Sequence, residues 1–184
     1  LTTVHGYLFA ENKIDTINWG NYNVIGSIAG TDIENQSIIP GGMFYNNNLK
    51  HIDIPDKVIA VDYEAFSTNL LEELTIKKNI RFLGNGAFQH NYISGDEDSN
   101  IDDHMPAVVK RTIKKLTFEE GGALQEIGPN VFRASIDGNI DIPDYITSIG
   151  ENAFRYNNIT KLRIPSSKPA LGNNAFLRTP LESI

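Results

Sequence analysis

The sequence predicts a repeat solenoid of the α/β type, in which each coil holds a short β-strand and a short helical or 3-10 turn. Two observations predict this fold. The first is a phenylalanine that recurs every 22 residues, with one gap of 44, at Phe44, Phe66, Phe88, Phe132, Phe154 and Phe176. The second is a pattern of apolar, small and polar positions that repeats around each of these residues and around Phe9. Self-similarity at a period of about 20 to 50 residues is typical of stacked repeats. We therefore expect about seven 22-residue coils.

The segment that ends at each phenylalanine is expected to form the helical turn. The residues one and five positions before the phenylalanine are apolar in all seven copies. In the copy from Ile149 to Phe154, apolar residues stand at i, i+4 and i+5, which is the spacing of one helical turn that faces inward. The position five before the phenylalanine holds Val4, Ile39, Val61, Leu83, Ile127, Ile149 and Leu171.

The strand is expected about eight to ten residues after each phenylalanine, where apolar and polar residues alternate with the period of a half-buried strand. Leu74 and Ile76, with Thr75 between them, are one example. Proline then ends the strand in three copies, because it cannot donate to a ladder of backbone hydrogen bonds. An asparagine three residues after the phenylalanine is expected to bond backbone groups that the turn leaves unpaired. It occurs as Asn12, Asn47, Asn69, Asn91 and Asn157.

The unit Ile-Gly-x-x-Ala-Phe-x-x-Asn-x-Ile-x-x-Leu-x-Ile-Pro, at residues 149–165, resembles the BspA-type leucine-rich repeat of bacterial and some protist surface proteins. The resemblance covers almost the whole chain, which we interpret as a single leucine-rich-repeat domain of residues 1–184. It implies a right-handed superhelix, secretion to the cell surface, and adhesion or protein binding. It implies no enzymatic activity and carries no fixed ligand residues.

Two segments depart from the repeat. One is a long first connection, roughly residues 20–37, and the other is an acidic insertion at about 94–112. The insertion contains alternating oxygen-bearing side chains at Asp96, Asp98, Asn100 and Asp102, a spacing that suits calcium. Ile101 stands where a calcium loop needs glycine, and Ala107 stands where it needs a bidentate carboxylate. A solvated acidic loop is thus the main interpretation, no cofactor is expected, and calcium is the alternative.

Composition restricts the partners. The formal net charge is −7, and nucleic acid or an anionic membrane surface would require a basic stripe. There is no cysteine, which excludes a disulfide framework and thiolate metal sites. No apolar run reaches the length of about 20 residues that spans a bilayer, so we expect no membrane insertion in this segment. The chain begins at Leu1 and ends inside a repeat, which we interpret as a fragment of a longer protein.

No catalytic residues are predicted, because the histidines lack a nucleophile partner and there is no Gly-x-Ser-x-Gly turn. A partner would touch the outward side of the strands, where stacked coils place side chains in rows about 4.8 Å apart. A solvated strand face is the main interpretation of these mixed polar rows, and ligand binding is the alternative. Only an arginine in these rows is of a type enriched in interfaces. The candidate ligand-binding residues are His51, Asp53, Glu73, Lys115, Lys161 and Arg163. Tyr45, Tyr92 and Tyr156, just after the phenylalanine in three copies, form a separate candidate patch on the turns.

Three functions remain open. The first is a non-catalytic, extracellular adhesion or protein-interaction module that binds a protein or host-surface ligand. The second is a structural stalk or spacer that presents another domain, which a polar strand face favours. The third is a carbohydrate-binding segment of a secreted enzyme, which would require clustered aromatic residues or paired carboxylates on an exposed surface.

Overall fold

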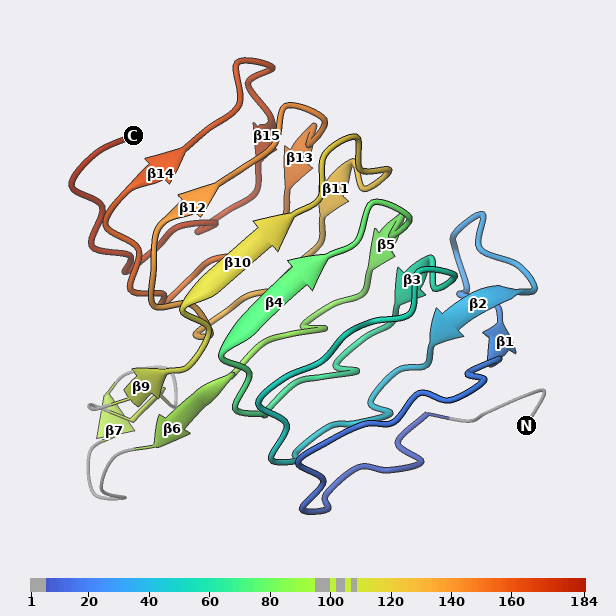
Figure 1. Ribbon diagram of the computed structural model, residues 1–184. Helices are drawn as coiled ribbons and strands as arrows, with labels where there is room; N and C mark the ends of the chain where they lie inside the picture. Colours follow the sequence, from blue (N-terminus) through green and yellow to red (C-terminus); the bar gives the residue numbers. More distant parts are fainter. Residues whose placement is uncertain (1–5, 95–99, 102–104, 107–108) are drawn as a thin grey trace.

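The computed structural model describes residues 6–94, 100–101, 105–106 and 109–184, and it is a β-solenoid. Its short strands fall into two columns that run along the stack (Figure 1). Ladder A consists of β2 (Gln36–Ile39), β3 (Ala60–Val61), β5 (Phe82–Leu83), β11 (Glu126–Ile127), β13 (Ser148–Ile149) and β15 (Ala170–Leu171). Ladder B consists of β4 (Glu73–Ile76), β10 (Lys115–Phe118), β12 (Ile140–Asp141) and β14 (Leu162–Arg163). Each regular coil thus contributes to two strand ladders, although the sequence predicted only one.

The coils are parallel and in register. Val61 lies beside Leu83 in ladder A, and Leu74 lies beside Leu116 in ladder B. Ladder A has six stacked strands from β2 to β15, which makes about five turns of the chain. The expected seven coils are therefore wrong. The first connection runs back as β1 (Ile25–Gly26), antiparallel to β2, and the chain after β15 adds only an isolated bridge at Ser183.

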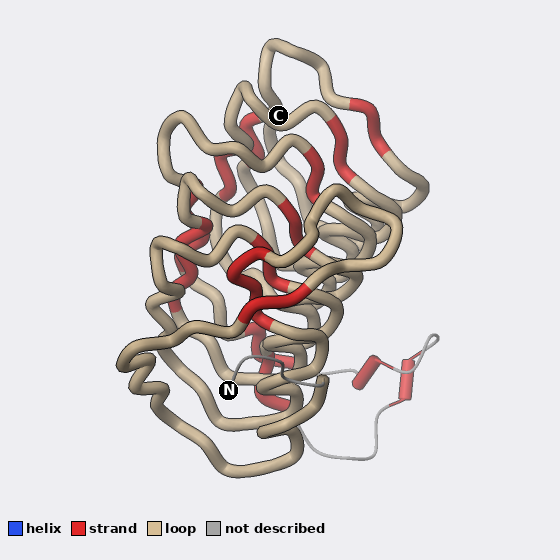
Figure 2. The backbone as a smooth tube through the Cα atoms, turned by 90° about the vertical axis from the view of Figure 1, so that its right-hand side faces the viewer, coloured by secondary structure: helices blue, strands red, loops and turns tan. Residues whose placement is uncertain are grey.

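The expected helical or 3-10 turns are also wrong, since the residues that the structure describes form no helix (Figure 2). The residues two before and two after Phe66, Glu64 and Thr68, have φ angles of 50° and 56°. Residues with left-handed backbone angles on both sides of Phe66 prevent a right-handed helix from continuing through it. The N–H of Phe66 accordingly donates to the carbonyl of Ala87 in the next coil, at 2.9 Å. Backbone pairing between coils thus replaces pairing within a helix.

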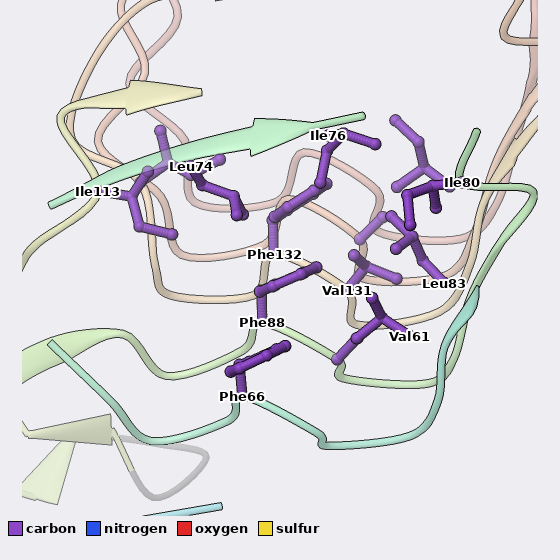
Figure 3. Close-up of a cluster of buried hydrophobic side chains, with 14 of the residues drawn as sticks. Val61, Phe66, Leu74, Ile76, Ile80, Leu83, Phe88, Ile113, Val131 and Phe132 are labelled. Carbon is purple, nitrogen blue, oxygen red and sulfur yellow. The ribbon is translucent and has the colours of Figure 1, made fainter. Parts of the chain in front are cut away.

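The phenylalanine rings form one column through the stack, as predicted from their spacing. Figure 3 shows Phe66, Phe88 and Phe132 pointing in the same direction, one over the next. Adjacent ring centroids lie between 5.2 and 5.9 Å apart from Phe9 to Phe176. The inward residues of both ladders surround this column and make one continuous core.

The asparagines three residues after the phenylalanines satisfy backbone groups of neighbouring coils, as the sequence predicted. The side-chain oxygen of Asn69 accepts from the N–H of Leu49 at 3.1 Å, and its amide donates to the carbonyl of Phe44 at 2.9 Å. Asn91 and Asn157 make the same pair of contacts. These amides are buried, and each therefore joins two coils.

The two departures from the repeat lie on different sides of the stack. The insertion leaves through β6 (Tyr92–Ser94) and returns through β9 (Val109–Arg111), which pair antiparallel; β7 (Asn100–Ile101) and β8 (Met105–Pro106) form a second pair within it. Figure 1 shows β6 and β9 at the side of the coils. The first connection instead covers the outer face of ladder A, where Ile28 and Ile33 pack with Ile38 and Ala60 in a small second core.

Candidate functional site

The predicted ligand-binding residues lie where the sequence placed them, exposed on the outer face of ladder B or in line with it. Lys115 is in register with Glu73, and Arg163 is in register with Asp141. His51 and Asp53 belong to the preceding coil, and Asp53 pairs with Lys77 at 2.9 Å. The predicted residues form a long polar row and do not converge on one point.

Ladder B is interrupted in the middle of this row. β4 pairs with β10, and β12 pairs with β14, but no strand pairing joins β10 to β12, all of whose residues are described. In β12, the N–H of Ile140 donates to the carbonyl of Lys161 at 3.1 Å. Leu116 is the counterpart of Ile140 one coil earlier, and it makes no such bond to β12. The two halves of the ladder are thus separated at this position.

The connection that follows β10 is longer than those of the neighbouring coils. Ile80, the next buried apolar residue, comes four positions after Ile76, whereas its counterpart Leu124 comes six positions after Phe118. The two extra residues lie in a Glu-Glu-Gly-Gly-Ala stretch. This longer connection distinguishes the coil of β10 from its neighbours, and it accompanies the separation of β10 from β12.

The separation opens a hollow of about 710 Å³ on the outer face of ladder B, which we call the β10–β12 hollow. Its apolar wall includes Leu116, Phe118 and Tyr145, which are only partly buried. Its charged rim includes Glu119, Glu120, Asp141, Asp144 and Arg163. Of the residues predicted from the sequence, only Arg163 lines this hollow. The aromatic residues were missed because the sequence assigned Phe118 to the core and gave Tyr145 no role.

The charges at this rim are organised around Arg163. Its guanidinium pairs with Asp141 and reaches Asp144 at 3.5 Å. The hydrogen bond that Arg163 donates to Asp141 raises the pKa of Arg163, so the side chain keeps its charge. Tyr145 is fixed beside it by a hydrogen bond from its hydroxyl to the carbonyl of Glu119, at 2.8 Å. Burial raises the pKa of Tyr145, which therefore stays a neutral donor.

A second hollow, of about 430 Å³, lies at the edge of the first connection on the ladder A side. Asp32 and Ile33 of the connection form one wall, and Arg81, Phe82 and Glu126 are among the residues opposite. Arg81 pairs with Asp32 across it. This ion pair bridges the opening, so the charges of the two side chains are already compensated.

The three candidate tyrosines do not form one patch. Tyr45 packs edge-on against Tyr7 near the first coils, with ring centroids 5.9 Å apart. Tyr156 is 5% exposed and packs with Tyr92 in a small separate cluster. The predicted tyrosine patch is therefore wrong as a single surface.

The calcium hypothesis concerns a segment that is largely outside the described residues. Asp96, Asp98 and Asp102 lie there, and only the backbone of Asn100 is described, in β7. Within the described part of the chain, no three histidine or carboxylate side chains are grouped so that they could hold a metal ion. Nor does that part contain a helix long and apolar enough to cross a membrane.

The comparisons with known proteins agree with the repeat architecture. Residues 1–95 and 109–184 match the model of the BspA type leucine-rich repeat region, in six copies. No curated protein matches the chain. The crystal structure of the pneumococcal vaccine antigen PcpA is similar, with 17% identity and a TM-score of 0.55, over 79% of this chain and 35% of that one. A leucine-rich repeat protein from Bacteroides ovatus has 16% identity and a TM-score of 0.55, over 80% of this chain and 40% of that one. The chain thus spans less than half the length of either structure.

Proposed function

Because the chain belongs to the BspA-type leucine-rich repeat family, we propose that it is a non-catalytic, extracellular interaction module that binds a protein through the outer face of ladder B. The observation that carries this proposal is the β10–β12 hollow, where Leu116 and Phe118 are reachable from a polar strand face. A stack of identical coils without such an interruption would present only a solvated row of polar side chains.

The chemistry of the hollow favours a protein partner. Protein interfaces combine an apolar centre that contains aromatic residues with a polar rim, and arginine and tyrosine are enriched at their most important positions. Phe118 and Tyr145 supply the centre, and Arg163 stands at the rim. Acidic side chains outnumber basic ones around it. We therefore expect the partner to insert an apolar side chain flanked by lysine or arginine.

A surface location fits this role. The family resemblance supports this part of the proposal, and one similar structure is described as a vaccine antigen. Because that likeness rests on the fold and on a minority of the antigen's length, the cell-surface and adhesion assignments are part of the proposal.

The spacer hypothesis predicts no ligand at all, and the carbohydrate hypothesis predicts binding to glycans alone.

The test uses two matched substitutions in ladder B. Thr117→Arg fills the β10–β12 hollow with a long cation, whereas Thr75→Arg places the same side chain at the register partner of Thr117 in β4. Wild type and both variants would be passed over immobilised purified host matrix proteins and glycans. We expect the wild type to bind at least one protein, and Thr117→Arg to weaken that binding by about tenfold or more, which is about 1.4 kcal/mol.

Thr75→Arg should change the affinity by less than about threefold, since a single surface charge away from the contact has a small effect. Equal losses in both variants would contradict the assignment of the hollow. Binding to no protein on the panel would support the spacer hypothesis, and binding to glycans alone would support the carbohydrate hypothesis.

A further inference from the structure

Ladder B is open between β10 and β12, and the width of the opening differs from the usual spacing of strands. Few Cα atoms of β10 lie within 8 Å of β12, whereas paired strands of this molecule approach one another more closely. Neighbouring strands of a sheet are about 4.8 Å apart, so an added strand needs about 9.6 Å between the two strands that it joins. The opening is thus wider than one strand spacing, as an added strand requires.

The free backbone groups of β12 follow from its pairing with β14. The N–H groups of Ile140 and Ile142 donate to the carbonyls of Lys161 and Arg163, at 3.1 and 3.0 Å. Successive residues of a strand direct their backbone groups to opposite sides, so the N–H and carbonyl of Asp141 face β10. No backbone group of β10, which is fully described, bonds to them.

The strand β10 presents a matching free edge. The N–H of Glu119, directly after β10, donates to the carbonyl of Ile76 in β4 at 3.0 Å. By the same alternation, the N–H and carbonyl groups of Leu116 and Phe118 face β12, where the described chain offers them no partner strand. Free strand edges of this kind are the surfaces to which an extended chain adds.

The opening is closed at both of its ends. Before β10, Ile113 forms a parallel bridge with Ile136, and after it β11 pairs with β13. A segment between β10 and β12 must therefore be short, and it must enter and leave on the outer face, where the β10–β12 hollow of about 710 Å³ opens. At about 3.3 Å per residue, about three residues span the length from Leu116 to Phe118.

The side chains around the opening select the sequence of such a segment. Leu116 and Ile140 pack in the core, so a residue placed between them needs an apolar side chain. The residues before and after it face outward, because side chains alternate along a strand. There they meet the rim, where Glu119 and Glu120 form no ion pair with the described residues. Charge complementarity favours lysine or arginine at both outward positions.

We propose that a short extended segment of the partner, with an apolar residue between two basic ones, lies between β10 and β12 as an added strand of ladder B. This inference rests on the protein-binding function proposed above, because it describes how the partner occupies the same hollow. In this mode of recognition, backbone hydrogen bonds supply affinity and alternate side chains supply specificity. The bound segment makes ladder B continuous from β4 to β14.

The probe is a capped synthetic peptide with the central sequence Lys-Ile-Lys between Gly-Ser spacers, added to the whole wild-type chain at millimolar concentration. NMR would follow the affinity and the exchange of individual amide hydrogens. At saturation, exchange at Leu116, Phe118 and Asp141 should slow by about tenfold or more, because these N–H groups gain partners. The N–H groups of Ile140 and Ile142 already have partners and should change by less than about twofold.

Two modified peptides separate backbone pairing from side-chain binding. N-methylation of the central isoleucine removes one backbone donor but keeps the charge and every side chain, and it should weaken binding by about tenfold or more. A Glu-Ile-Glu peptide keeps the spacing with the opposite charge and should also bind at least about tenfold more weakly. Thr117→Arg should abolish the amide protection, and Thr75→Arg should retain it.

The outcomes distinguish this inference from the function on which it rests. Equal affinity of the N-methylated and parent peptides, or no amide protection in β10 and β12, would overturn strand addition. The same holds if the peptide does not bind although Thr117→Arg weakens the binding of a host protein, since the hollow then acts through side chains alone. If host proteins bind wild type and Thr117→Arg equally well and the peptide does not bind, both proposals fail.

Discussion

The ring of Phe66 lies parallel to the ring of Phe88, with centroids 5.5 Å apart and an angle of 3° between their planes. Both residues are fully buried. Rings also stack along the rest of the column, so each ring between the two end rings is covered on both faces by the coils before and after it. Because every coil contacts only its neighbours, the stability of the molecule depends on the continuity of this column.

Removal of one ring should therefore be costly. Phe66→Ala leaves a cavity between two coils and should lower the free energy of unfolding by about 3 to 5 kcal/mol. Urea unfolding followed by circular dichroism would measure this loss. Phe9→Ala is the matched control, since Phe9 is 37% exposed at the end of the column, and its loss should be much smaller. An unchanged unfolding transition in Phe66→Ala would mean that the coil alignment is wrong.

The buried asparagines should be nearly as sensitive. Asn69→Ala leaves the N–H of Leu49 and the carbonyl of Phe44 without their side-chain partner. Each unsatisfied buried group costs about 1 to 3 kcal/mol, so thermal unfolding should occur at a clearly lower temperature. Asn12→Ala, at an exposed copy of the same position, should have little effect. Equal melting temperatures for the two variants would argue against the bridging role.

Stability should depend on pH through His90. Burial, then the charge of Arg133, lowers its pKa to about 4 from an ordinary value of 6.5. Between these values the unfolded chain binds a proton that the folded chain does not, so stability is retained above pH 6.5 and lost as the pH falls toward 4. The contribution is roughly 2 to 4 kcal/mol.

The matched variant for this prediction is His90→Asn, because His90 has a φ of 58° and asparagine tolerates that conformation. Wild type should lose more stability than the variant when urea unfolding at pH 7 is compared with pH 4. Parallel losses in the two proteins would show that His90 is accessible to protons in the folded state.

In the wall of the β10–β12 hollow, the ring of Tyr145 lies in close contact with Gly122. A Cβ atom at this position would lie 2.6 Å from the ring of Tyr145. Gly122→Ala should displace the ring, break its hydrogen bond to Glu119, and cost about 1 to 3 kcal/mol. In a Tyr145→Ala background the same substitution should cost almost nothing, which a double-mutant cycle would measure. Additive losses would show that the two residues do not interact.

The phenylalanine spacing was sufficient to predict the ring column, the asparagine contacts and the polar row on ladder B. It was not sufficient to predict the absence of helix, since Glu64 and Thr68 have left-handed backbones although neither residue type favours them. Backbone pairing between coils enforces that conformation, and such pairing is a tertiary effect. One signal was nevertheless present, because the position two before the phenylalanine is glycine or asparagine in five other copies. These are Gly42, Gly86, Asn130, Asn152 and Asn174.

The candidate site was only partly predictable for a similar reason. Arg163 was identified because its outward position follows from the strand period. The coil that borders the β10–β12 hollow has two additional residues between Phe118 and Leu124, a difference that is visible in the sequence. The separation of β10 from β12 is seen only when the coils are stacked.

The interruption of ladder B is the central claim, and amide hydrogen exchange of β10 and β12 in the wild-type chain tests it most directly. The N–H groups of Ile140 and Ile142 donate to Lys161 and Arg163 and should exchange slowly. Their counterparts Leu116 and Phe118 have no partner strand on that side and should exchange much faster. Equal protection at the two pairs of positions would mean that ladder B is continuous and that the hollow does not exist.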